Sequence, residues 1–87
     1  MDERIRQLID ITGIDELVKR TPIGTNRWRT VRYDKRTRIS TKEAEALISI
    51  YPQYGLWIST GQVAPEAGQT SPEYDEANKN LKEQGQG

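Results

Sequence analysis

The stretch "IDELVKRTPIGTNRWRTVRY", Ile14 to Tyr33, contains two short helical patterns separated by a break, and this arrangement decides the fold. The break falls at Thr21–Gly24, because proline disfavours helical geometry in the residue before it and glycine permits a sharp change of direction. Asp15 and Thr25 have the short polar side chains typical of helix N-caps. The stretch therefore predicts a helix, a tight turn and a second helix from Thr25 to Tyr33.

The second of these helices is expected to have one buried and one polar face. Trp28 and Val31 are three residues apart and define its inner face. The outward positions are polar: Asn26, Arg27, Arg29, Thr30 and Arg32. This is the arrangement of a helix-turn-helix motif, in which the second helix lies in the DNA major groove.

Three further helical patterns complete a domain over residues 1–62. Residues 3–12 have apolar positions at helical spacing, and Gly13 is placed to end that helix in a left-handed conformation. Ser40 and Glu43 have the spacing of a capping box that opens a fourth helix, which Pro52 stops. A short apolar helix over residues 54–60 is closed by Gly61. We therefore expect an all-α, five-helix domain.

Residues 63–87 differ from this domain in composition. They are rich in Pro, Gly, Glu, Gln and Asn and poor in aliphatic residues, so that little apolar burial is available to offset the entropy of ordering. Ser71 followed by Pro72 is typical of a helix start. We expect a mobile acidic tail with a frayed helix over residues 72–83.

Composition excludes several classes of function. The 87 residues include no cysteine and no histidine, which removes disulfides, thiolate metal sites, thiol nucleophiles and the commonest general base. We expect no metal, cofactor or small-molecule substrate, and an enzyme is the weakest interpretation. Apolar stretches stay shorter than the roughly 20 residues that span a bilayer, and the N-terminus has no signal-peptide pattern, so we expect a soluble cytoplasmic protein without membrane contact.

The formal net charge of zero hides a strong segregation of charge. Residues 19–42 contain nine basic residues and one acidic residue, whereas residues 1–18 and 43–87 are both net acidic. Exposed charges further apart than about 8 Å are largely screened from one another at physiological salt, so a polyanion would meet a cationic segment. Nucleic acid is the natural partner. The alternative is a solvated charged face that the acidic ends of the chain compensate.

The sequence from Ile14 to Gly61, with its basic loop and the closing "LWISTG", resembles the lambda-repressor-like family of helix-turn-helix DNA-binding domains. The resemblance implies a five-helix domain that binds operator duplexes as a homodimer and regulates transcription, often in phages or prophages. Three positions depart from the family pattern: Val18 and Pro22 stand where alanine and glycine are usual, and Trp28 replaces an aliphatic residue. Because proline cannot adopt a positive φ, the turn at Pro22 must differ in detail.

Matching this motif onto the chain assigns candidate DNA contacts. The residues expected to contact bases are Thr25, Asn26, Arg27 and Arg29. Those expected to contact the DNA backbone are Arg32, Tyr33, Lys35, Arg36 and Arg38. Asn26 suits an adenine edge and arginine a guanine edge, whereas the loop cations suit phosphates. The alternative is that Arg29 and Arg32 pair with Asp34, Glu3 or Glu43.

The last short helix is too apolar for a solvated surface. Part of the set Leu56, Trp57, Ile58 and Val63 is therefore expected to form a homodimer contact. Two other functions remain open, both using the same basic face: RNA binding, and a non-enzymatic protein-interaction module.

Overall fold

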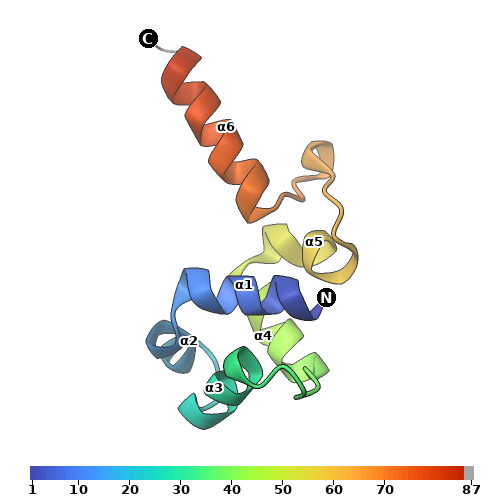
Figure 1. Cartoon of the computed structure of the whole chain (residues 1–87). Helices are drawn as coiled ribbons and strands as arrows, with labels where there is room; N and C mark the ends of the chain where they lie inside the picture. Colours follow the sequence, from blue (N-terminus) through green and yellow to red (C-terminus); the bar gives the residue numbers. More distant parts are fainter. Residues whose placement is uncertain (86–87) are drawn as a thin grey trace.

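The computed structural model describes residues 1–85, with side chains as far as residue 79, and within them every regular element is helical. The α-helices are α1 (Asp2–Thr12), α2 (Ile14–Arg20), α3 (Thr25–Tyr33), α4 (Thr41–Ile50), α5 (Gly55–Thr60) and α6 (Pro72–Gly85). Short 3-10 turns, η1 (Pro52–Tyr54) and η2 (Pro65–Ala67), flank α5. Figure 1 shows α1 across the middle of the molecule, α2 and α3 at one end, and α6 projecting from the other. The expected all-α class is confirmed.

The hydrophobic core forms around α1, which packs against α2, α3 and α4. Its fully buried side chains are Ile5, Leu8, Ile9, Leu17, Trp28, Val31, Leu47 and Ile58, with Tyr54 and Trp57 nearly so. Burying one such side chain stabilises the fold by about 1.5–3 kcal/mol. Both residues predicted for the inner face of the helix from Thr25 to Tyr33 belong to this core, which fixes how α3 is rotated about its axis.

Two arginines of α1 attach it to the ends of other helices. Arg4 donates from Nε to the carbonyl of Ile58 in α5 at 3.2 Å, and Arg6 donates from Nε to the carbonyl of Val31 in α3 at 3.0 Å. Both carbonyls belong to the last turn of their helix, where the backbone has no helical hydrogen-bond donor. The side chains of α1 therefore secure the C-terminal ends of both α3 and α5.

The helix ends follow the sequence predictions in part. Ser40 and Glu43 form the expected capping box, and Gly61 ends α5 with φ 79° in the left-handed region. Gly13 has φ 89° but ψ 139°, so it is not left-handed helical; it ends α1 and is also the residue before α2. The predicted N-caps Asp15 and Thr25 are wrong. Gly13 and Gly24 occupy those positions, where glycine without a side-chain bond is well tolerated.

The segment after α5 makes hydrogen bonds to the domain that its composition did not indicate. The Gln69 side chain accepts from the backbone N–H of Leu56 at 2.9 Å and donates to the carbonyl of Pro52 at 3.2 Å. The phenol of Tyr54 donates to Asp75 at 2.7 Å. Ser71 is buried and caps α6, as the sequence predicted. The segment before α6 is thus attached to η1 and α5 through Gln69, and the beginning of α6 is attached to η1 through Asp75.

Candidate nucleic-acid interface

The turn between α2 and α3 is organised by the hydroxyl of Thr21. This hydroxyl donates to the carbonyl of Leu17 at 2.6 Å and accepts a hydrogen bond from the indole Nε1 of Trp28 at 3.2 Å. The chain leaves α2 at Thr21 with extended geometry, and Gly24 has φ −84°, so the turn Thr21–Gly24 uses no positive φ. Pro22 is therefore compatible with this turn. The indole of Trp28, larger than the aliphatic residue usual in lambda-repressor-like domains, finds its polar partner in the same turn.

The outer face of α3, defined here by Thr25, Asn26, Arg29 and Tyr33, is exposed along its whole length. With about 100° of rotation per residue, these four side chains fall within one sector of about 100°. Thr30 is also exposed at the edge of the sector, and its hydroxyl bonds the carbonyl of Asn26. The buried Trp28 and Val31 anchor the opposite side, so the outer face is held rigidly toward solvent.

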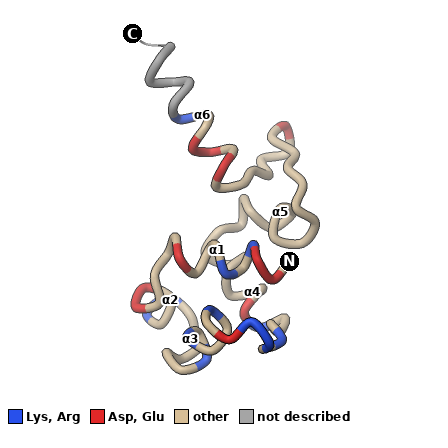
Figure 2. Tube along the Cα trace, in the orientation of Figure 1, with Lys and Arg blue, Asp and Glu red and all other residues tan. Residues whose placement is uncertain are grey.

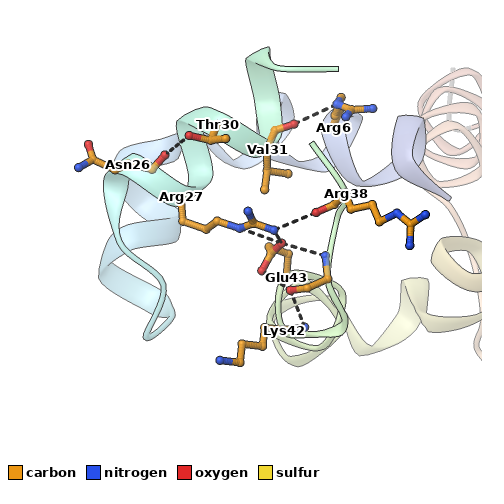
Figure 3. A network of polar contacts seen from close by, with 9 residues as sticks. Arg6, Asn26, Arg27, Thr30, Val31, Arg38, Lys42 and Glu43 are labelled. Carbon is orange, nitrogen blue, oxygen red and sulfur yellow. Dashed lines mark hydrogen bonds and ion pairs between the residues drawn. The ribbon is translucent and has the colours of Figure 1, made fainter. Parts of the chain in front are cut away.

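Arg27 does not share this outer face. Its position on α3 lies about 100° beyond the edge of the sector, and Figure 3 shows its side chain directed toward α4. The guanidinium bonds a Glu43 carboxylate oxygen from Nε at 3.2 Å and from Nη2 at 2.7 Å, and Nη2 also donates to the carbonyl of Arg38 at 3.0 Å. The structure thus separates Arg27 from the other three predicted base contacts.

The Glu43 carboxylate is the buried end of this ion pair. Only 2% of Glu43 is exposed, and Ser40 donates to it from the backbone N–H at 3.0 Å and from the hydroxyl at 2.7 Å. Burial alone raises the pKa of Glu43, but the hydrogen bonds from Arg27 and Ser40 outweigh it and hold the pKa below its ordinary value. Glu43 therefore stays ionised and keeps Arg27 in place.

Arg32 lies on the other flank of α3, toward α1. Its Nε pairs with Asp10, and its guanidinium carbon lies 5.1 Å from the centre of the Tyr33 ring. The hydrogen bond that Arg32 donates to the Asp10 carboxylate is the main reason that the pKa of Arg32 is raised. An acidic partner for Arg32 was one of the alternatives left open by the sequence, but Asp10 was not among the partners considered.

The loop between α3 and α4, residues 34–39 and hereafter the basic loop, continues the cationic surface. Lys35, Arg36 and Arg38 are all exposed, and the Arg36 guanidinium lies 3.4 Å from the Asp34 carboxylate inside the loop. Figure 2 shows these cations gathered beside α4, at the end of the molecule that carries α3, while acidic residues dominate the start of α6. Lys42, at the start of α4, is exposed and extends this surface, but it was not among the predicted contacts. Its position between Ser40 and Glu43 of the predicted capping box would have placed it at the start of a helix, next to the basic loop.

A solved structure matches almost the whole molecule. Pf6r from the filamentous phage Pf6 of Pseudomonas aeruginosa PA01 is 51% identical in sequence, with a TM-score of 0.85 over 92% of this chain and 94% of the Pf6r chain. The chain belongs to the Pf6r family. No protein-family model matches the sequence. A comparison with curated proteins likewise gives no match.

In this member of the Pf6r family, the predicted dimer residues divide into two groups. Trp57 and Ile58 are 7% and 1% exposed, because both pack into the core of their own chain. Both side chains therefore offer little surface for contact with a second subunit. Leu56 is half-buried and Val63 is 39% exposed, so these two remain accessible.

Over the residues described, no helix has both the length and the apolar character required to cross a bilayer.

Proposed function

We propose that this protein is a sequence-specific, double-stranded DNA-binding transcriptional regulator of the phage-repressor type, with a lambda-repressor-like helix-turn-helix. In this proposal α3 lies in the major groove with its outer face toward the bases. The observation that carries the proposal is the rigid presentation of Asn26 and Arg29. Both are exposed on a helix whose other side is anchored by Trp28 and Val31, each with no exposed surface.

The chemistry of the outer face suits base edges. The Asn26 amide can bond an adenine edge in two places, and the Arg29 guanidinium can bond the O6 and N7 of guanine. Each such pair gives about 1–3 kcal/mol of discrimination against the wrong base. Thr25 lies at the N-terminal end of α3, and the N-terminal residues of a recognition helix are the ones that contact base edges. Sequence preference would therefore come from the first half of α3.

The exposed cations around α3 suit the phosphates. The basic loop would supply sequence-independent affinity through Lys35, Arg36 and Arg38. This part of the affinity would fall as the salt concentration rises. Tyr33 can donate to a phosphate from its exposed phenol, and Arg32 can contact a phosphate where Asp10 leaves its guanidinium open. A nucleic-acid partner would thus account for the basic residues that gather at one end of a chain whose net charge is zero.

A homodimer is part of the proposal. Repressors of this kind bind two half-sites about 34–36 Å apart, so that a pair of α3 helices enters successive major grooves on one side of the duplex. Leu56 and Val63 are the accessible apolar residues from the predicted interface, and association of two copies would add apolar burial to a small core.

Selection from a random duplex pool with the wild-type chain, followed by binding titrations at several salt concentrations, tests this function. We expect one enriched sequence with two related half-sites one helical turn apart. Equal capture of all duplexes, or preferential capture of single-stranded RNA of random sequence in a parallel selection, would contradict it. The second result would favour the RNA-binding alternative.

A further inference from the structure

The Arg27 side chain joins three separate segments of the chain. It belongs to the first turn of α3, it donates to the backbone of the basic loop at Arg38, and it pairs with Glu43 in the first turn of α4 (Figure 3). The Nη2 atom makes the last two contacts at once, at 3.0 Å and 2.7 Å. The guanidinium thus fixes the basic loop relative to both helices that it connects.

Hydrogen bonds to α3 hold the basic loop at both of its ends. At its start, Asp34 donates from its backbone N–H to Thr30 in the last turn of α3. The bonds from the N–H groups of Thr37 and Arg36 to Asp34 shape the turn inside the loop. At the far end of the loop, Arg27 of α3 donates to the Arg38 carbonyl, next to Ile39, which packs against the hydrophobic core.

The energetics of the pair indicate a geometric role. An ion pair with one buried member contributes little net stability, because removing a carboxylate from water costs about as much as the attraction returns. Glu43 could cap α4 through Ser40 alone. The arginine partner adds the planar, forked set of donors that can hold a carboxylate and a carbonyl in fixed directions.

We propose that Arg27 is a positioning residue for DNA recognition: locked by Glu43, it sets the place of the basic loop relative to the outer face of α3. In this arrangement the Arg27 guanidinium contacts no base. The cations of the basic loop then contact phosphates at a fixed position relative to Asn26 and Arg29, which contact the base edges. This inference rests on the proposed DNA-binding function and replaces the base contact predicted for Arg27.

The test uses the double variant R27M/E43Q in the full-length chain. Methionine keeps the aliphatic stem of Arg27, glutamine keeps an acceptor for Ser40, and the net charge of the chain is unchanged. The matched control is R20M/E16Q, which removes the exposed pair on α2 at 3.4 Å, also without a change in net charge. Thermal unfolding followed by circular dichroism establishes that both variants are folded.

Three measurements then separate positioning from other roles. Amide hydrogen exchange over residues 34–39 is expected to be at least several-fold faster in R27M/E43Q than in wild type and unchanged in R20M/E16Q. On the sequence selected by wild type, R27M/E43Q is expected to lose about tenfold in affinity and about one unit of salt slope. A repeated selection should return the same bases, because only phosphate contacts are displaced.

Three results would overturn the inference. Unchanged loop exchange in the folded double variant would show that Arg27 does not set the loop. A changed base preference at one position would show that Arg27 contacts that base. Wild-type affinity in the double variant would show that the loop position does not matter. By contrast, failure of wild type to bind any duplex would overturn the proposed function itself, and with it the inference.

Discussion

The indole nitrogen of Trp28 donates to the hydroxyl of Thr21 at 3.2 Å, which links the core of α3 to the turn in front of it. Replacing Thr21 with valine keeps the shape of the side chain but leaves this buried indole N–H without its acceptor. We expect T21V to lower the free energy of unfolding by about 1–3 kcal/mol. Urea titration followed by Trp fluorescence measures the change.

The control for T21V is the same substitution at exposed Thr41. T41V is expected to leave the free energy of unfolding within about 0.5 kcal/mol of wild type. Equal effects of the two substitutions would show that the indole contact contributes nothing to stability.

The ionised Glu43 makes stability depend on pH in a defined direction. Because the pKa of Glu43 is lower in the folded state than its ordinary value of 4.5, its contribution is fully present above pH 4.5 and is lost as pH falls through the folded value. The difference in unfolding free energy between wild type and E43Q should therefore be largest near pH 7 and vanish in strong acid. Urea titrations at pH 7, 5 and 3 measure it.

The exposed Glu45 on the same helix provides the comparison for loss of one carboxylate. A difference between wild type and E43Q that grows as the pH falls below 4.5 would contradict the assignment of Glu43 as the buried anion. If E45Q reproduced the behaviour of E43Q, the effect would come from net charge alone.

DNA-binding variants should separate into two kinds. We expect N26A and R29A to relax preference at individual base pairs, at a cost of about 1–3 kcal/mol on the selected sequence. We expect K35A and R36A to weaken binding to all duplexes alike and to reduce the salt slope by about one each. Fluorescence anisotropy with the selected duplex and with single-base variants measures both. If all four variants behaved alike, the division into a base-facing helix and a phosphate-facing loop would be wrong.

The bond from Tyr54 to Asp75 should hold the start of α6. Burial, followed by the contact with Asp75, raises the pKa of Tyr54, so the phenol remains protonated and able to donate. We expect Y54F to accelerate tryptic cleavage after Lys79 several-fold while the core stays folded. The control is Y74F, which alters an exposed ring on α6 itself. Identical cleavage rates in wild type and Y54F would show that the bond does not restrain the helix.

Local patterns predicted most of the fold. The spacing of Trp28 and Val31 gave the rotation of α3, and Ser40 with Glu43 gave the start of α4, because both depend on residues within one or two helical turns. The glycine N-caps were missed, since Asp15 and Thr25 are better cappers by type. Neighbouring glycines accept the required geometry without a side-chain bond.

The candidate site was predicted in composition but not in geometry. Nothing in the sequence pairs Arg27 with Glu43 or Arg32 with Asp10, because these partners are brought together by helix packing over 16 and 22 residues. The bonds of Gln69 across 13 and 17 residues were missed for the same reason. Arginines that look equivalent in the sequence therefore differ in what they are free to contact.

The direction in which α6 leaves the molecule has a practical consequence. Figure 1 shows α6 pointing away from α3, along the longest dimension of 45 Å. A fluorophore, affinity tag or sensor surface coupled behind this helix would stand clear of the cationic end. The protein can thus be immobilised in one orientation with α3 and the basic loop turned toward a duplex in solution, as a binding measurement of the proposed function requires.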